Sequence, residues 1–371
     1  MKEKLLGKNL TELQAAAEAC GLKPFVGKQL ADWLYAKRVR SWDRMVNISK
    51  AGREALADRF ELGTSDPVGT AQSSDGTRKY LFPVGTVSAS CRAWAPDRDN
   101  DHPAIPLEGV QGVKAERDDH RFVESVVIPD AERKTLCVSS QAGCRMGCKF
   151  CMTGRGGYHG QLDAADILNQ FISIEESEGL TNAVFMGMGE PLDNYDTVSR
   201  VIAVLTADWG FGWSPKRITL STIGVLPALR RFLDGERCHL AVSLHNPFPE
   251  ERLSIMPAQK AWDIREVIDL IRQYDFSGQR RVSFEYTMFA GFNDDKRHAD
   301  ALIRLLRGLE CRVNLIRFHQ IPDFPWGCAS DSAMEAFRDR LNNHQILCTI
   351  RSSRGEDILA ACGMLAGQHS E

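Results

Sequence analysis

The chain has 371 residues, of which 43% are hydrophobic and 26% are charged, so it can bury the core of one large α/β domain and a smaller one. No apolar run approaches the roughly 18 residues of a membrane span, and the N-terminal MKEKLLGKNLTELQ lacks the apolar core of a signal peptide. The net charge of −3 does not by itself indicate a nucleic-acid binder. We therefore expect a cytoplasmic protein without a membrane partner, whose 11 cysteines are thiols or ligands rather than disulfide staples.

The first 62 residues are predicted to form a small helical domain. Apolar residues recur at helical spacing in LTELQAAAEACGL, VGKQLADWLYAKRV and KAGREALADRF. Residues 1–60 carry 12 Lys and Arg against 7 Asp and Glu, a local charge of +5 that leaves −8 for the rest. Trp33, Tyr35 and Trp42 are interleaved with these cations, which suits RNA, because phosphates attract cations and bases stack on aromatic rings. The same pattern also fits core aromatics beneath a solvated charged face, so both interpretations stay open.

A region of short strands, residues 63–130, follows the helical domain. The segments RKYLFPV, VSASCRAWA and FVESVVIP are predicted strands. Between the last two, residues of about 95–120 are rich in Asp, Pro and Gly and show no sustained periodicity. We interpret them as a long insertion, to which the sequence assigns no function.

Strands and helices alternate in the main domain, residues 131–371. The predicted strands are TLCVSS, NAVFMG, RITLST, HLAVSLH, RVSFEYTM and RVNLIRF, and helices such as AADILNQFISIEESEG and DIREVIDLIRQYD separate most of them. This alternation is typical of βαβ units and a parallel sheet, so the fold class is α/β. In barrels built this way, the site forms at the C-terminal ends of the strands.

Three closely spaced cysteines follow the first of these strands. Cys144, Cys148 and Cys151 stand in GCRMGCKFCMTG in the order C-x3-C-x2-C. Thiolates hold iron–sulfur clusters, and a four-iron cluster with three cysteine ligands keeps one iron open to a small molecule. Cys137 lies seven residues upstream, so four thiols could instead close a zinc site or a complete electron-transfer cluster. The C-x3-C spacing fits a zinc knuckle poorly.

The cysteine run closely resembles the signature of the radical SAM superfamily, which usually also has an aromatic residue where Phe150 stands. The resemblance implies a partial (β/α)6 TIM-like barrel, a [4Fe–4S] cluster, and S-adenosylmethionine (SAM) on the open iron. GMGEPLDN, after the second strand, matches the family's GGEP-like motif, in which Gly189 and Glu190 would grip the amino group of SAM. The other SAM contacts that the resemblance implies stand at or near strand ends: Ser221, Ser243, Leu244, His245 and Asn314.

Two further cysteines make the resemblance more specific. Cys137 in CVSSQAGC and Cys362 in RGEDILAACG, together with GMGEPL, SLH and VNLIRFH, resemble the RlmN-type RNA adenine-C2 methyltransferases. These are relatives of the Cfr-type C8 methyltransferases. The match spans residues of about 120–367 and extends less specifically through the N-terminal helical domain, while the insertion lies outside the pattern.

The resemblance implies methylation of C2 of an adenosine in the peptidyl-transferase centre of 23S ribosomal RNA and of an adenosine in the tRNA anticodon loop. Cys362 would take a methyl group from one SAM, and a radical made from a second SAM would remove hydrogen from that methyl group. The methylene group would then add to the adenine as a protein–RNA crosslink. Glu124 matches the family's proposed base, and Cys137 would release the product by forming a transient disulfide with Cys362. An electron donor such as flavodoxin is a further implied partner.

Two alternative functions stay open. A Cfr-like C8 methyltransferase would use the same site motifs, although GCRMGCKFCMTG and RGEDILAACG are more similar to the C2 branch. A noncatalytic iron–sulfur protein that binds RNA would explain the cluster and the basic N-terminus, but it leaves Cys137, Cys362 and GMGEP without a role. Glu124 could also be an ordinary glutamate on a strand face.

Overall fold

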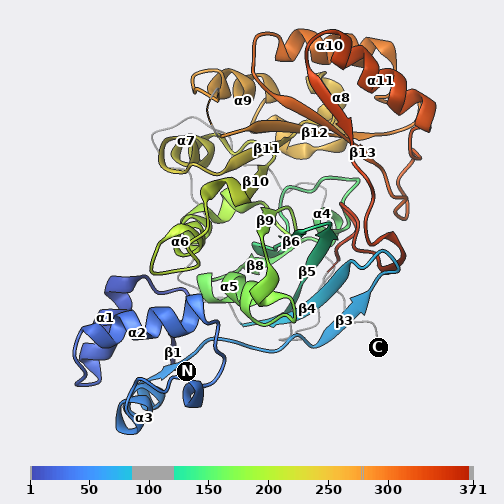
Figure 1. Cartoon of the computed structure of the whole chain (residues 1–371). Helices are drawn as coiled ribbons and strands as arrows, with labels where there is room; N and C mark the ends of the chain where they lie inside the picture. The colour runs from blue at the N-terminus through green and yellow to red at the C-terminus, as the bar shows by residue number, and fades with distance from the viewer. Residues whose placement is uncertain (1, 86–120, 277, 279, 367–371) are drawn as a thin grey trace.

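A ten-stranded mixed sheet is the centre of the molecule (Figure 1). The computed structural model describes residues 2–85, 121–276, 278 and 280–366. The predicted strand VSASCRAWA and the predicted insertion at about 95–120 therefore lie outside the described residues. The strands run in the order β14-β13-β12-β11-β10-β9-β6-β5-β4-β3.

Seven of these strands are parallel neighbours. They are β6 (Arg133–Cys137), β9 (Asn182–Phe185), β10 (Ile218–Thr222), β11 (His239–Ser243), β12 (Val282–Met288), β13 (Arg312–Arg317) and β14 (Leu347–Ile350). The first six confirm the predicted strands, and β14 was not predicted. The sheet stays open because β14 and β3 are its two edges.

Helices follow the parallel strands, and those of eight residues or more cover one face of the sheet (Figure 1). They are α4 (Met152–Arg155), α5 (Ala164–Ile172), α6 (Tyr195–Thr206), α7 (Leu226–Gly235), α8 (Pro249–Ile255), α9 (Ile264–Ile271), α10 (Lys296–Leu306) and α11 (Asp331–Asn343). Helix α9 shows why they dock: Ile264, Val267, Ile268 and Ile271 recur at helical spacing and are all buried. Burying each such side chain stabilises the fold by about 1.5–3 kcal/mol. None of the helices in the described ranges has the length and apolarity needed to span a bilayer.

Antiparallel strands extend the sheet beyond β6. They are β3 (Gly69–Gln72), β4 (Arg78–Val84) and β5 (Arg121–Asp130), and β5 pairs with β6. A separate hairpin, β7 (Gln141–Gly143) with β8 (Tyr158–Gln161), frames the cysteine loop. The hairpin and β3 were not predicted, because both are short segments without a clear apolar alternation.

The N-terminal helices pack beside α5 and α6 (Figure 1). This part contains β1 (Glu3–Lys4), α1 (Leu10–Ala19), α2 (Phe25–Ala31), a π-helical turn (Asp32–Ala36), a 3-10 turn (Trp42–Arg44), α3 (Lys50–Arg59) and β2 (Phe60–Glu61). The second predicted helix is thus divided at Asp32. Tyr35 is fully buried, and its hydroxyl donates to the Lys8 carbonyl at 2.6 Å. Its ring lies 5.9 Å from that of Trp209, so the core interpretation is right for Tyr35.

Candidate active site

The three cysteines of the C-x3-C-x2-C run lie between β7 and helix α4. All three are free thiols and are half-buried. Cys144 interacts electrostatically with both Cys148 and Cys151, which places the three thiols near one another. Burial raises the pKa of the Cys144 thiol well above its ordinary value and that of Cys148 to about 12. Cys144 and Cys148 therefore keep their protons until a bound metal replaces them.

The GMGEP loop after β9 approaches the end of β6 closely. A Cβ at Gly187 would lie 2.7 Å from Ser139 Oγ, and one at Gly189 would lie 2.5 Å from Gln141 Cβ. Gly189 also has a φ of +97°, which L side chains rarely adopt. The Glu190 N–H donates to Gln141 Oε1 at 2.8 Å, so glycine at both positions lets this loop place Glu190.

The Glu190 carboxylate is buried at the end of the strand pair β9 and β10. It accepts hydrogen bonds from the backbone N–H groups of Leu192 at 3.0 Å and Ile223 at 2.9 Å. Burial raises the pKa of Glu190 to about 7, although these two hydrogen bonds favour the ionised form. A buried carboxylate with a pKa near neutrality is suited to accept from an ammonium group, which would keep it ionised.

Four polar residues form one row across four neighbouring parallel strands. Ser243, Glu285, Asn314 and Thr349 are direct register partners on β11, β12, β13 and β14. Asn314 Nδ2 donates to Glu285 Oε1 at 2.8 Å, and Thr349 Oγ1 donates to Asn314 Oδ1 at 3.0 Å. Ser243 ends its strand as predicted, but Asn314 is the third residue of β13, so its predicted place near a strand end is wrong. Asn314 nevertheless lies level with Ser243 across the sheet, because β13 continues for three residues beyond Asn314.

Leu244 and His245 form the turn that leaves β11. Leu244 is fully buried, and His245 is buried with a φ of +57°. His245 Nδ1 accepts from the Thr287 N–H at 3.0 Å. Burial, assisted by the charge of Arg252, lowers the pKa of His245 to about 3. The imidazole is therefore neutral with its proton on Nε2, and its ring meets that of Phe150 edge-on at 4.9 Å. Ser221 is the fourth of the five residues of β10 and is half-buried.

The C-terminal segment lies directly on the cysteine loop. The backbone N–H of Met152 donates to the Gly363 carbonyl at 2.7 Å. The hydroxyl of Thr153 donates to the Leu365 carbonyl at 2.6 Å. Helix α4 follows the last cysteine of the run. Its two hydrogen bonds fix Gly363 and Leu365, and they thereby also position the adjacent Cys362.

The Cys362 thiol interacts electrostatically with four neighbouring side chains. It interacts with the thiols of Cys151 and Cys137 and with the charges of Arg351 and Glu285. Cys362 is exposed, yet enough protein surrounds its thiol that burial raises its pKa, while Arg351 opposes that rise. The methyl-carrier cysteine predicted from the sequence is therefore within electrostatic range of both a cysteine of the loop and Cys137. Cys137 and Cys362 are both free thiols, and their transient disulfide stays a prediction.

Glu124 is a buried carboxylate on β5 that reaches the same C-terminal segment. Its Oε1 lies 2.9 Å from Lys79 Nζ, and its Oε2 accepts from the backbone N–H of Ala366 at 2.7 Å. The Ser139 hydroxyl donates to its carbonyl at 2.5 Å. A glutamate on an exposed strand face would make no such contacts, so Glu124 belongs structurally to the segment that carries Cys362.

Comparisons with known proteins agree with this geometry. The family described as "Radical SAM superfamily" matches residues 138–302, and "Ribosomal RNA large subunit methyltransferase N-terminal domain" matches residues 3–62. A "Probable dual-specificity RNA methyltransferase RlmN" of Porphyromonas gingivalis is 53% identical over 99% of this chain and 98% of that protein. A "Dual-specificity RNA methyltransferase RlmN" of Syntrophus aciditrophicus is 35% identical over 98% of this chain and 96% of that protein.

The chain belongs to the RlmN family. The crystal structure of a radical SAM methyltransferase from Sphaerobacter thermophilus superimposes with a TM-score of 0.85 at 34% identity, covering 99% of this chain and all of that chain. The agreement confirms the predicted α/β radical SAM fold with its N-terminal helical part. For an RlmN protein, membership of the radical SAM superfamily implies a [4Fe–4S] cluster and SAM.

The residues of this RlmN-family chain fit that cluster. Cys144, Cys148 and Cys151 interact with one another, whereas the thiol that interacts with Cys137 is Cys362. Cys137 thus interacts with Cys362 rather than with the three thiols of the loop. This arrangement agrees better with a cluster on three cysteines than with a closed four-cysteine site. Over the described ranges, no group of three or more His, Cys, Asp or Glu is arranged for a single metal ion. A cluster of several irons spaces its ligands more widely than one ion does.

The sequence did not identify several polar groups that lie in this candidate site of the RlmN-family chain. Gln141 joins the loops, since its Nε2 donates to Asp193 Oδ2 at 2.6 Å while its Oε1 accepts from Glu190. Glu285 and Arg252 are buried near the cysteines. Arg252 gave one available signal: in the helix PEERLSI it shares the inward face with Ile255, where a charged residue is rare.

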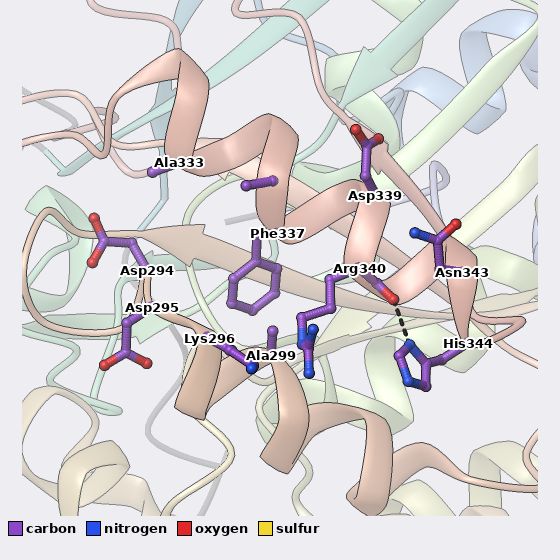
Figure 2. A pocket seen from close by; sticks show the side chains of 11 residues that line it. Asp294, Asp295, Lys296, Ala299, Ala333, Phe337, Asp339, Arg340, Asn343 and His344 are labelled. Carbon is purple, nitrogen blue, oxygen red and sulfur yellow. Dashed lines mark hydrogen bonds between the residues drawn. The ribbon is translucent and has the colours of Figure 1, made fainter.

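A pocket on the outer side of the sheet contains none of the predicted site residues. Figure 2 shows it at helices α10 and α11, with Phe337 between them and Arg340 beside His344. The Nδ1 of His344 lies 2.8 Å from the Arg340 carbonyl. Its lining mixes acidic and basic side chains, so the pocket indicates no ligand.

Proposed function

We propose that this protein is a dual-specificity RNA methyltransferase that methylates C2 of an adenosine in 23S ribosomal RNA and of an adenosine in the tRNA anticodon loop. One observation carries the proposal: the segment that carries Cys362 lies on the cysteine loop, where the Met152 N–H donates to the Gly363 carbonyl at 2.7 Å, and the Cys362 thiol interacts electrostatically with Cys151 and Cys137. A methyl carrier needs both neighbours, one that holds the radical source and one that releases the product. The names of the full-length relatives point to the same activity.

The protein's own residues would bind and orient the reactants. Cys144, Cys148 and Cys151 would hold the cluster, and Glu190 would accept from the amino group of SAM, with Gly189 allowing the close approach. Ser221, Ser243, Leu244, His245 and Asn314 would line the rest of the SAM site. When bound, the cluster and SAM supply a carbon radical that can remove a hydrogen atom from a methyl group.

Cys362 would carry the methyl group through a covalent cycle. Its thiol loses a proton and takes the methyl from one SAM by displacement, leaving S-adenosylhomocysteine. After loss of one hydrogen atom, the methylene group adds to C2 of the adenine, which crosslinks Cys362 to the RNA. The adduct would hold one unpaired electron, which returns to the oxidised form of the electron donor, while Glu124 would take the proton from the ring carbon. Cys137 would then attack the sulfur of Cys362, which forms a disulfide, and the released carbon takes a proton from water to become the methyl group of the RNA. Cellular thiols would reduce that disulfide.

The N-terminal part would help to bind RNA. We propose a division into residues 1–62 as an RNA-binding domain, 63–130 as a strand-rich linker and 131–371 as the catalytic barrel. Lys28, Lys37, Arg40 and Arg44 are exposed, and Lys37 lies 3.8 Å from the Trp33 ring centre. Cations beside a half-exposed indole are suited to phosphates and bases.

We also propose a cytoplasmic location and an electron donor such as flavodoxin, because the cycle starts with a one-electron reduction and needs reduced thiols to reset the disulfide.

Nucleoside analysis tests the proposed function. The reconstituted protein, SAM and a reductant would be incubated with ribosomal RNA and tRNA, and the digested RNA would be examined by mass spectrometry. We expect 2-methyladenosine in both RNAs. 8-Methyladenosine would show the Cfr-like activity instead, and absence of both methylated nucleosides and of 5′-deoxyadenosine would favour a noncatalytic iron–sulfur protein.

A further inference from the structure

Arg252 is a fully buried guanidinium on helix α8 that donates its hydrogen bonds to neutral oxygens. Its Nε donates to the Leu244 carbonyl at 3.0 Å, and its Nη2 donates to the carbonyls of Ser243 at 2.9 Å and Ile223 at 3.2 Å. Its Nη1 donates to Gln259 Oε1 at 2.6 Å. The side chain therefore ties together the ends of β10 and β11, where the SAM site is proposed.

This cation has no acidic partner at contact distance in the part of the chain that the structure describes. No carboxylate there lies within 4.0 Å of the guanidinium, although Asp263 acts on it from further away. Burial lowers the pKa of Arg252 to about 10, so it remains positively charged at neutral pH. Neutral carbonyls satisfy its hydrogen bonds, but they do not balance its charge. A buried charge without a paired opposite charge is costly and calls for a compensating anion.

The cysteine loop lies directly on the helix that carries Arg252. The backbone N–H of Lys149, the residue after Cys148, donates to the carbonyl of Ile255 at 2.9 Å, and Ile255 is the last residue of α8. At this separation the charge of Arg252 acts on the Cys148 thiol. Arg252 also acts on His245 at the turn after β11. A [4Fe–4S] cluster on three thiolates is anionic and becomes more so on reduction, so it would supply the missing charge.

We propose that Arg252 is the fixed cation of the cluster pocket: it positions the strand ends that bind SAM, and its charge raises the reduction potential of the cluster. The inference rests on the cluster assignment in the proposed function. Arg252 is a positioning residue, since it contacts the backbone behind the site. A nearby positive charge stabilises the reduced cluster over the oxidised one, which makes the single electron easier to accept.

Arg280 offers a matched control in the same fold. It too is buried and donates to backbone carbonyls, those of Cys238 at 3.1 Å, Leu233 at 2.9 Å and Phe232 at 3.3 Å. These carbonyls precede the N-terminal end of β11, the end of the strand opposite Ser243. Arg280→Gln therefore removes a similar buried cation from the far end of the sheet.

The test compares Arg252→Gln, Arg252→Lys and Arg280→Gln with the wild-type protein after anaerobic reconstitution. Iron and sulfide content, the cluster's reduction potential from a spectroscopic redox titration, and SAM affinity are measured for each. In Arg252→Gln we expect the ratio of reduced to oxidised cluster at a fixed potential to fall about tenfold, which corresponds to about 59 mV for one electron. Arg252→Lys keeps the charge but not the fork of donors, so its potential should stay near that of the wild type while its SAM affinity falls. Arg280→Gln should change neither quantity.

Three results would overturn the inference. One is a wild-type reduction potential in an Arg252→Gln protein with full cluster content. Another is that the ratio of reduced to oxidised cluster falls equally in Arg280→Gln. The third is a tenfold fall of that ratio in Arg252→Lys, which keeps the positive charge, and this result would suffice even if Arg252→Gln does not hold a cluster. Failure of the wild-type protein itself to assemble a cluster would instead overturn the proposed function, and this inference with it.

Discussion

The backbone N–H of Met152 donates to the carbonyl of Gly363 at 2.7 Å. Met152 directly follows Cys151, the last cysteine of the C-x3-C-x2-C run, and Gly363 directly follows Cys362, the proposed methyl carrier. This single hydrogen bond joins two segments that are far apart in the sequence. It sets the position of Cys362 relative to Cys151, the relationship on which the proposed chemistry depends.

Gly363→Val should separate this pair. Gly363 has a φ of +83°, so a β-branched residue there costs about 1–3 kcal/mol and shifts the segment. A displacement of the carrier by about 1 Å is expected to lower RNA methylation about 100-fold, measured as the initial rate of methyl incorporation. Cluster content should not change, because Cys144, Cys148 and Cys151 keep their places.

Gly308→Val is the control for Gly363→Val. Gly308 has a similar φ of +76°, and a Cβ there would have nothing within 4 Å. Gly308→Val should therefore lose stability through backbone strain but retain the wild-type rate of RNA methylation. Equal activity losses in the two variants would mean that the Gly363 contact has no specific role.

Glu190 should make stability depend on pH. Burial raises its pKa from 4.5 to about 7, so the folded state binds this proton more tightly than the unfolded chain. The stabilisation from Glu190 is fully present below pH 4.5 and is lost as the pH rises through about 7. The loss is about 3 kcal/mol at most. Urea unfolding of the cluster-free protein should show it, and Glu190→Gln should flatten the pH profile. A profile unchanged by Glu190→Gln would contradict the assignment.

Lys79→Met should destabilise the protein through Glu124. The substitution removes Lys79 Nζ, the cation that lies 2.9 Å from Oε1 of this buried carboxylate. The expected loss is about 3 kcal/mol in the free energy of unfolding. Lys216→Met, at an exposed lysine with no ion pair among the described residues, should change it by less than about 0.5 kcal/mol. In Lys79→Met combined with Glu124→Gln, most of the stability should return; if it does not, the pair is not the cause.

The parallel sheet and the cysteine site were predictable because each depends on a local pattern. The six predicted strands are buried apolar runs separated by helices, and C-x3-C-x2-C needs no tertiary information. Strand β14 was missed because it is a short edge strand in which Leu347 is exposed and Cys348 buried. The burial of Tyr35 was not predictable either, since it depends on Trp209, far along the chain. Arg252 and Glu285 could not be assigned because their role comes from partners on other strands.

Charge reversal in the N-terminal part tests its proposed role in RNA binding. Deleting residues 1–60 would not do so cleanly, because Leu5, Leu13 and Tyr35 belong to the hydrophobic core. Lys28 and Arg44 are exposed, so Lys28→Glu with Arg44→Glu should weaken RNA binding without unfolding. The slope of log affinity against log salt should fall by about one for each interaction with a phosphate that the substitutions remove.

A matched charge change controls for the overall charge of the molecule. Lys216→Glu with Arg304→Glu makes the same change at exposed sites on the barrel. RNA affinity and salt slope should stay close to wild type in that variant. The same weakening in both double variants would show that the N-terminal part has no special role.

The most direct test of the central claim is a denaturing gel of Cys137→Ala with RNA, SAM and a reductant. The variant should accumulate RNA covalently attached through Cys362, because the thiol proposed to break that bond is missing. The adduct should be sensitive to nuclease, absent in Cys362→Ala and in the double variant, and absent in Cys328→Ala, which removes an exposed free thiol. Free methylated RNA from Cys137→Ala at the wild-type rate, without any adduct, would contradict the account.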